Sequence, residues 1–312
     1  MEERVEKPSG IYEISSLVCH RHVADAVCCL GSLRRFPVEK LMLNLHDDGT
    51  LTGEDLAALA SGLPGCRIIA RREGDEIAGE ALRGHPYCAA LRKRNAMAIK
   101  IFDTVLASGG RHYIFADTDV LFLRPWAGLF TLPTNGANAV FMLNPGDAYC
   151  ISPLGYLATP RLGLPRRLNS GLCVLRRSSY DLDFFEWLIR SPAFRTRQAE
   201  WLMDQTVWAA AAYRMGLAFW SESNVAIAAP GVQPAELVAG HFAGGRRKFI
   251  QEAAKLAATA PRPAELAVPL VESERLSRSC CSRQWVMLKW NRGRDRMSRL
   301  LNRGGGAGII RG

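Results

Sequence analysis

Strand-like segments alternate with helical segments along the first 120 residues, and this alternation constrains the fold more than any other feature. The strand-like segments are short and apolar, and turn signals or helical patterns follow them. The expected strands are Ile14–Cys19, Leu41–Leu45, Arg67–Ala70 and His112–Ala116, and the expected helices are Val23–Leu33, Thr52–Ser61 and Cys88–Ala107. This order predicts an α/β fold with a mostly parallel mixed sheet flanked by helices. The 312 residues suffice for one large domain or two modest ones, and we expect one.

The second half of the sequence is less regular. Strands are expected at 139–142 and 172–175, helices at 180–189 and 201–213, and a closing strand at 238–241. We expect the domain to cover residues 1–252, followed by an Ala- and Pro-rich linker and a basic tail over residues 253–312. The sequence has no G-x-G-x-x-G or G-x-x-x-x-G-K-[ST] loop, so metal and side chains would have to hold any phosphate groups.

The positive charge of the chain lies almost entirely in its tail. Residues 275–312 contain ten Lys or Arg and one acid, Asp295, which accounts for nine of the ten excess positive charges. Trp285–Trp290 interleaves aromatic and charged residues there. This composition fits either attachment to an anionic membrane surface or a solvated tail. A nucleic-acid-binding protein would also carry basic charge on its folded surface, so we expect no nucleic-acid partner.

Sequence features favour a cytoplasmic protein, with peripheral attachment to the inner face of a membrane as an option for the tail. The N-terminal residues lack the layout of a signal peptide, and no apolar run reaches the roughly 18 residues of a membrane span. The nine cysteines form no Cys-x-x-Cys pair, and most lie in apolar stretches. We therefore expect buried, reduced thiols, with Cys280-Cys281 as the exception because it lies in the basic segment.

Two aspartates stand at the end of the strand expected at 112–116. The segment Tyr113–Pro125 is apolar except for Asp117, Thr118, Asp119 and Arg124. Residues i and i+2 of a strand point to the same side, so both carboxylates can converge. Two such charges are costly to bury without a cation, and oxygen ligands suit Mg²⁺ or Mn²⁺. Because ligands bind at the carboxyl ends of parallel strands, we predict a metal site for a phosphorylated ligand, the alternative being a turn with solvated acids.

The chain contains a comparison for this spacing. Asp181 and Asp183 are also one residue apart, but their context is polar and then helical. Such residues cap a helix and interact favourably with its dipole. We interpret Asp181 and Asp183 as structural, so the strand context rather than the spacing carries the metal prediction.

Three later segments follow the aspartate pair along the chain and contain polar residues that can contribute to the same site. They are Leu168-Asn169-Ser170-Gly171-Leu172, Met203-Asp204-Gln205-Thr206-Val207-Trp208 and Gly240–Lys248, which begins Gly-His-Phe-Ala-Gly-Gly. With the aspartates they resemble glycosyltransferases of the GT-A fold, most closely family 8, from about Ser15 to Lys248. The resemblance implies a Rossmann-like sheet and metal-dependent transfer of a sugar from a nucleoside-diphosphate donor.

The resemblance also implies the metal ligands. Asp117 and Asp119 would bind Mn²⁺ or Mg²⁺ bridging the diphosphate of a nucleotide-sugar, and His241 would complete the metal shell. The alternative for His241 is a packed histidine at a strand end.

Three residues would face the sugar by the same resemblance. They are Asn169, Asp204 and Gln205, with Gln205 nearest the anomeric carbon. Without the resemblance, Asn169-Ser170-Gly171 would be a turn and Asp204-Gln205 an exposed part of a helix.

Donor contacts are expected from Lys100, Thr118, Arg247 and Lys248. The family pattern has a Lys six residues after the His, a position that Arg247 holds here, and Lys248 stands where the family has Pro. Either cation could contact the diphosphate, but Arg is forked and Lys is a point charge. Lys100 lies among apolar residues and is a further phosphate candidate.

Four residues after the first two strands have weaker assignments. His20 and His22 either help to bind the base or are polar loop residues, and Asp47 and Asp48 are turn acids.

The donor sugar and the acceptor are not specified by the sequence. We expect a carbohydrate, lipid or protein acceptor at residues 144–167. The resemblance implies transfer with retention of the anomeric configuration, and the lack of an evident carboxylate nucleophile fits the retaining chemistry of that family. The alternatives are a pseudoenzyme that binds nucleotide-sugars and a haloacid-dehalogenase-like phosphatase, although the latter normally has Thr or Val where Leu121 stands.

Overall fold

The structure is a computed structural model, and it describes residues 11–36, 40–134, 136–194, 200–228, 237–259 and 266–277. Its strands are β1 (Tyr12–Val18), β2 (Leu41–Asp47), β3 (Arg67–Ile69), β4 (His112–Ala116), β5 (Val120–Phe122), β6 (Trp126–Ala127), β7 (Ala139–Leu143), β8 (Leu168–Arg176), β9 (Leu217–Trp220), β10 (Val225–Ile227), β11 (Ala239–His241), β12 (Leu266–Ala267) and β13 (Leu270–Glu272). Its α-helices are α1 (Val23–Leu33), α2 (Gly53–Gly62), α3 (Arg71–Ala81), α4 (Pro86–Arg94), α5 (Asp103–Leu106), α6 (Pro153–Leu157), α7 (Leu182–Arg190), α8 (Met203–Met215) and α9 (Ile250–Thr259). Its 3₁₀ helices are η1 (His20–His22), η2 (Ala96–Lys100), η3 (Arg177–Ser179), η4 (Pro192–Phe194), η5 (Glu200–Leu202) and η6 (Gly244–Phe249).

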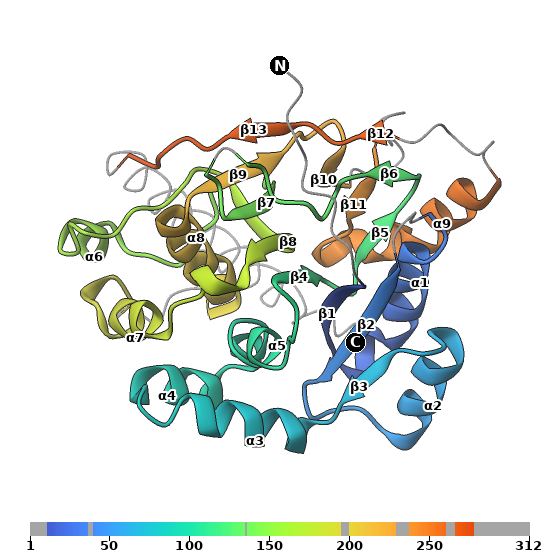
Figure 1. Ribbon diagram of the computed structural model, residues 1–312, viewed down its shortest axis with the longest axis horizontal. Helices are drawn as coiled ribbons and strands as arrows, with labels where there is room; N and C mark the ends of the chain where they lie inside the picture. The colour runs from blue at the N-terminus through green and yellow to red at the C-terminus, as the bar shows by residue number, and fades with distance from the viewer. Residues whose placement is uncertain are drawn as a thin grey trace, which may run out of the picture.

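Eight strands form the main sheet in the order β13-β9-β7-β8-β4-β1-β2-β3 (Figure 1). Strands β3, β2, β1 and β4 pair in parallel, and so do β7 and β9. Strand β8 runs antiparallel to β4 and β7, and β13 runs antiparallel to β9. The mostly parallel mixed sheet predicted from the sequence is therefore confirmed. Strand β4, which precedes the aspartate pair, lies in its interior.

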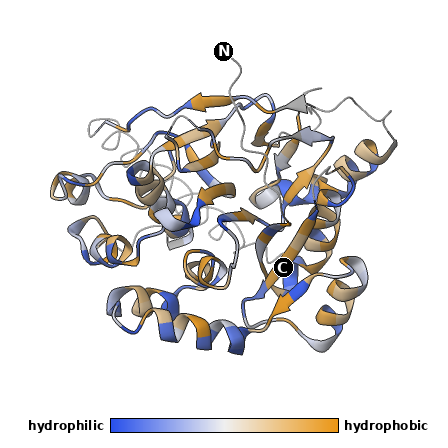
Figure 2. Cartoon of the chain, in the orientation of Figure 1, coloured by the Kyte–Doolittle hydropathy of each residue, from blue (hydrophilic) through white to orange (hydrophobic). Residues whose placement is uncertain are grey.

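Alternate residues of β4 enter two hydrophobic cores on opposite faces of the sheet. Tyr113 and Phe115 pack in a core shared with α3, α4, α7 and α8, whereas Ile114 and Ala116 pack in a core shared with α1 and α2. A strand covered on both faces needs an uninterrupted apolar sequence, which β4 has from Tyr113 to Ala116. Figure 2 shows hydrophobic residues gathered on the strands, and hydrophilic residues along outer helices such as α3.

A second, three-stranded sheet has the order β10-β11-β5. The strand expected at 238–241 is present as β11, but it belongs to this second sheet and does not close the main one. The chain turns between Asp117 and Val120, and β5 then leaves the main sheet and pairs antiparallel with β11. This pairing sets His241 opposite Val120, directly beside Asp119.

The long helix expected at 88–107 is wrong, because three shorter elements occupy this stretch: α4, η2 and α5. Asn95 interrupts the pattern with an extended backbone, and its side chain accepts a hydrogen bond from the Met97 amide at 2.9 Å. Asn favours such local bonds over a helix interior. Helix η2 begins directly after this break and ends at Lys100, which is buried.

Two local predictions are confirmed. Thr52 and Asp55 form a reciprocal capping box at the start of α2. Asp181 caps α7, since its side chain accepts a hydrogen bond from the Phe184 amide at 3.1 Å, and Asp183 is exposed in the first turn of the helix. The sequence pattern did not predict α3, whose buried residues are only Gly74 and Ala78.

The described chain continues in ordered elements after residue 252. Helix α9 spans the boundary proposed there, β12 pairs with β6, and β13 joins the edge of the main sheet at β9. The tail segments singled out above, including Cys280-Cys281 and Trp285–Trp290, lie outside the described residues. Within the described part of the chain, no helix has both the length and the apolar character needed to cross a membrane.

Candidate metal and donor site

Backbone hydrogen bonds hold the aspartate pair at the end of β4. The Asp117 amide donates to the Gly171 carbonyl of β8 at 2.7 Å, and the Val120 amide donates to the Asp117 carbonyl at 3.1 Å. The Asp119 carbonyl accepts a hydrogen bond from the Phe242 amide at 2.8 Å, directly after β11. Both sheets thus fix this turn, and Thr118 is buried within it.

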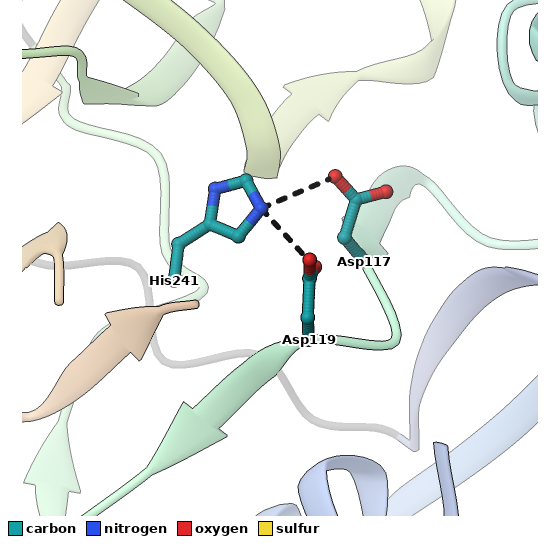
Figure 3. A group of neighbouring side chains, drawn as sticks. All are labelled: Asp117, Asp119 and His241. Carbon is teal, nitrogen blue, oxygen red and sulfur yellow. Dashed lines mark ion pairs between the residues drawn. The ribbon is translucent and has the colours of Figure 1, made fainter. Parts of the chain in front are cut away.

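Asp117, Asp119 and His241 form one cluster at this turn (Figure 3). His241 Nε2 lies 3.1 Å from Asp119 Oδ1 and 3.7 Å from Asp117 Oδ2. One ligand atom from each residue lies within 4.8 Å of the others. The structure therefore brings the three predicted metal ligands together, although His241 comes from a different sheet than the strand before Asp117.

The donor atoms of this cluster fit a hard divalent cation. Asp119 Oδ1 is buried and makes no hydrogen bond of acceptable geometry, although His241 Nε2 is near. His241 Nδ1 lies 3.0 Å from Asn169 Oδ1, an acceptor, so Nδ1 is assigned the proton and Nε2 keeps a lone pair in the neutral ring. A lone pair and a carboxylate oxygen that face each other are satisfied by a cation between them. Two carboxylates and one imidazole suit Mn²⁺ or Mg²⁺.

Lys100 supports the cluster from inside the protein. Its ammonium lies 3.0 Å from both oxygens of Asp117, 3.2 Å from Asp204 Oδ2 and 3.3 Å from Ser170 Oγ. Burial alone lowers the pKa of the ammonium, but Asp117 and Asp204 outweigh this effect and raise it. The pKa of Asp117 is raised by burial, and Lys100 opposes the rise. Lys100 thus joins a metal-site carboxylate to the predicted sugar site.

Arg247 binds the carboxylate oxygen of Asp119 that does not face His241. Its Nη2 lies 2.9 Å from Asp119 Oδ2, and its Nη1 lies 3.0 Å from Asp25 Oδ2 on α1. Burial alone would raise the pKa of Asp119, but the positive charges of protonated His241 and of Arg247 hold it well below its usual range. The two oxygens of Asp119 are therefore divided: Oδ2 binds Arg247, and Oδ1 faces His241.

Gly171 is required by the packing of this site. A Cβ atom at residue 171 would lie 2.4 Å from both Cε1 and Nδ1 of His241 and 3.0 Å from Asn169 Oδ1. Asn169-Ser170-Gly171 is part of β8 and is not a turn. The pairing of β7 with β8 changes register here, between Phe141 and Met142. The irregularity and the missing side chain let the His241 ring approach the strand.

The predicted sugar-facing residues are buried beside this cluster. Asp204 accepts a hydrogen bond from Ser170 Oγ at 2.9 Å in addition to its pairing with Lys100. Gln205 donates from Nε2 to the Ala148 carbonyl at 2.6 Å. Neither residue lies on an exposed part of α8.

The other predicted residues have contacts outside the cluster of Asp117, Asp119 and His241. Lys248 is exposed in η6, with its ammonium 5.0 Å from the Phe249 ring centroid. His20 pairs with Asp55, and His22 Nδ1 lies 3.2 Å from Cys19 Sγ.

Asp47 and Asp48 are turn residues, as predicted. Asp47 Oδ1 accepts hydrogen bonds from the Gly49 and Leu51 amides, and Asp48 Oδ1 accepts from Thr50. The cysteines of the described part, of which Cys29, Cys88, Cys150 and Cys173 are fully buried, are free thiols.

Sequence reasoning missed three residues that complete the network. Ser170 stands inside a segment already singled out, and Asn144 is the first residue of the predicted acceptor segment 144–167, so their positions carried a signal. Asp25 lies in the first turn of α1, where acidic residues are common. Its position therefore gave no sign of a role in this site.

Comparison with known proteins relates the chain to others by structure. No protein-family model and no curated protein sequence matches it. The bifunctional glycosyltransferase WbbM superimposes with a TM-score of 0.51 at 10% identity, covering 82% of this chain and 51% of WbbM. The galactosyltransferase LgtC, in complex with donor and acceptor sugar analogs, matches with a TM-score of 0.48 at 12% identity over 80% and 98% of the two chains. Core-mannan synthase A from Aspergillus fumigatus, in a Mn/GDP form, gives 0.43 at 12% identity over 80% and 85%.

The chain spans about half the length of WbbM, and at 10% identity the similarity concerns the fold. This similarity supports the fold predicted from the sequence and gives no support to the phosphatase alternative. The protein has the GT-A fold that its sequence predicts.

Proposed function

We propose that this protein is a metal-dependent glycosyltransferase that takes a sugar from a nucleoside-diphosphate donor. The observation that carries the proposal is the cluster of Asp117, Asp119 and His241 at the end of β4, in which the buried Asp119 Oδ1 faces His241 Nε2. The end of a central strand in a sheet of this kind is where ligands bind. Mn²⁺ or Mg²⁺ held by these three residues would supply Lewis acidity to the diphosphate leaving group.

The charges of the site are consistent with a divalent cation. The network contains four carboxylates and two side-chain cations, which leaves two negative charges when His241 is neutral. The six residues are Asp25, Asp117, Asp119, Asp204, Lys100 and Arg247. One divalent cation neutralises this set, so a diphosphate needs a further positive group.

The contacts of the basic residues separate their roles. Lys100 is enclosed by carboxylates, and Arg247 is shared between Asp119 and Asp25. We assign both to orientation of the metal-site carboxylates, although Lys100 and Arg247 were expected to touch the donor. Lys248 is exposed in η6, the 3₁₀ helix that also contains Arg247, and we propose it as the better diphosphate contact. Fixed positive charge there would stabilise the departing nucleoside diphosphate.

Gln205 and Asp204 define the sugar end of the site. The Gln205 amide nitrogen is directed to the Ala148 carbonyl, so the carbonyl oxygen of the same amide is the atom that would face developing positive charge on the sugar carbon. Asp204 is held by Lys100 and Ser170, which suits a fixed acceptor for a sugar hydroxyl. Retention of the anomeric configuration is proposed from the resemblance to family 8, and no residue is assigned as a covalent nucleophile.

The acceptor and the location are further parts of the proposal. The segment 144–167 lies between β7 and β8 and ends two residues before Asn169, so it is the proposed acceptor side. The acceptor would be a carbohydrate, a lipid or a protein. A cytoplasmic enzyme whose basic tail binds the anionic inner face of a membrane fits the charge distribution.

A panel of nucleotide-sugars tests this function. The protein is incubated with each donor and Mn²⁺, and release of free nucleoside diphosphate is measured, with the Asp119→Asn variant as the matched control. We expect metal-dependent release for at least one donor and none with the variant. Tight metal-dependent binding without turnover for any donor would instead identify a nucleotide-sugar-binding pseudoenzyme.

A further inference from the structure

A chain of hydrogen bonds runs from the proposed acceptor-side segment to His241. Asn144 Oδ1 accepts from Asn169 Nδ2 at 3.2 Å, and Asn169 Oδ1 lies 3.0 Å from His241 Nδ1. His241 and Asn169 are both buried, on β11 and β8. These hydrogen bonds therefore connect the loop after β7 to Nδ1 of His241, the ring nitrogen that does not face Asp119.

The direction of each bond is set by a backbone group. The Gly171 amide donates to Asn169 Oδ1 at 2.8 Å, so this atom is an oxygen and an acceptor. The neighbouring His241 Nδ1 must then donate, which leaves Nε2 without a proton in the neutral ring. At the other end, Asn144 Nδ2 donates to the Gly146 carbonyl at 2.7 Å, so Asn144 presents its oxygen to Asn169.

The backbone around Asn144 is held under strain. Arg167 has a φ of +59°, in the left-handed region that residues other than Gly seldom adopt. Its carbonyl accepts from the Asn144 amide at 2.5 Å, and its Nε donates to the Asn144 carbonyl at 2.8 Å. A strained residue persists where its surroundings fix it, and such residues gather at functional sites. Here the strained residue, Arg167, stands two residues before Asn169, and its two hydrogen bonds hold the backbone of Asn144 beside β8.

We propose that Asn169 and Asn144 are positioning residues that hold His241 in the tautomer protonated at Nδ1, so that Nε2 is free to bind the cation. The opposite tautomer would place a proton between Nε2 and Asp119 Oδ1, 3.1 Å apart, and that hydrogen bond would compete with the metal. Asn169 acts directly, and Asn144 acts through Asn169. The inference deepens the proposed function, because it assigns the residues that prepare a ligand of the same metal site.

The tautomer is measured without any metal. Protein labelled with nitrogen-15 in histidine is examined by NMR at pH 9, where imidazole side chains are ordinarily neutral. We expect His241 Nδ1 to be protonated in the wild type and in Asn169→Asp, which keeps the acceptor oxygen. In Asn169→Leu, which removes it, the Nε2-protonated form should dominate. The same Nδ1-protonated ring in Asn169→Leu would overturn the proposal.

Metal affinity is then measured with Mn²⁺ alone by electron paramagnetic resonance. Loss of an outer partner of a ligating His typically weakens metal binding 10- to 100-fold, and we expect this range for Asn169→Leu. Asn169→Asp should bind Mn²⁺ at least as tightly as the wild type. This rescue distinguishes the loss of an acceptor from a general disturbance of the fold.

A double-mutant cycle tests whether Asn144 acts on His241 through Asn169. Asn144→Leu should weaken Mn²⁺ binding about threefold, less than Asn169→Leu, because the Gly171 amide still fixes the Asn169 oxygen. The double variant should bind no more weakly than Asn169→Leu alone. If the two substitutions weaken Mn²⁺ binding independently, so that their effects multiply in the double variant, Asn144 does not act through Asn169 and this part of the proposal is wrong.

The two proposals fail in different ways. If the wild type binds no Mn²⁺, the proposed metal-dependent function fails, whereas the tautomer measurement still decides the role of Asn169. If the wild type binds Mn²⁺ and Asn169→Leu binds it equally well, the positioning role is wrong and the metal site stands.

Discussion

Lys100 places its ammonium 3.0 Å from both carboxylate oxygens of Asp117, in a position that solvent does not reach. Removal of one member of a buried ion pair leaves an uncompensated charge, which typically costs about 3–5 kcal/mol. We therefore expect Lys100→Met to lower the free energy of unfolding by roughly this amount in a urea titration.

The matched control is Lys93→Met, which changes the same residue type at an exposed position on α4. Its unfolding free energy should stay within about 0.5 kcal/mol of the wild type. Equal stability of the two variants would show that Lys100 carries no structural ion pair.

Gly171 and Gly79 should respond in opposite ways to substitution by Ala. A Cβ at Gly171 would lie 2.4 Å from the His241 ring, whereas a Cβ at Gly79, inside α3, meets no atom within 4 Å. Gly171→Ala should destabilise the fold by about 2 kcal/mol or more and abolish Mn²⁺ binding. Gly79→Ala should stabilise the protein by about 0.5–1 kcal/mol, because Ala loses less backbone entropy in a helix. Urea midpoints and Mn²⁺ titrations measure both effects.

The aspartate pair on α7 should affect stability only. Asp181 caps the helix, so Asp181→Ala should cost about 1 kcal/mol. Asp183 has a side chain that is 95% exposed, and Asp183→Ala should change stability by less than about 0.5 kcal/mol. Neither change should alter Mn²⁺ affinity, and a loss of affinity in either variant would contradict the assignment of these residues.

The strand end that carries Asp117 and Asp119 could be predicted because the apolar strand and the two acids lie next to each other in the sequence, and because the alternation of strands and helices indicates a parallel sheet. The approach of His241 could not, since it depends on β5 leaving the main sheet and pairing with β11, and only the resemblance to a family indicated it. The environment of Lys100 was also hidden. An apolar pattern around a Lys does not show which carboxylates will surround it. The break before η2 depends on a single residue, Asn95, in an otherwise helical pattern.

Stability should fall on acidification partly because of His46. This side chain on β2 is buried, and burial lowers its pKa to about 4, with a smaller contribution from Arg67. The unfolded chain takes up the proton near the ordinary pKa of about 6.5, before the folded protein does, so the contribution of neutral His46 is complete above pH 6.5 and is lost as the pH falls toward 4.

Unfolding free energies at pH 7.5 and pH 5 check this effect. The wild type should lose more stability over this interval than His46→Gln, by on the order of 2 kcal/mol, because Gln does not titrate. An identical loss in both proteins would show that His46 does not contribute.

The central claim is that Asp117, Asp119 and His241 form a metal site. It is tested most directly by titration of Mn²⁺ into the wild type, Asp119→Asn and Asp183→Asn, with free Mn²⁺ measured by electron paramagnetic resonance. The two variants make the same chemical change in two Asp-x-Asp pairs of equal spacing. We predict one tight site in the wild type, unchanged affinity in Asp183→Asn and at least about 100-fold weaker binding in Asp119→Asn, because a ligand charge is lost. Wild-type affinity in Asp119→Asn would contradict the account.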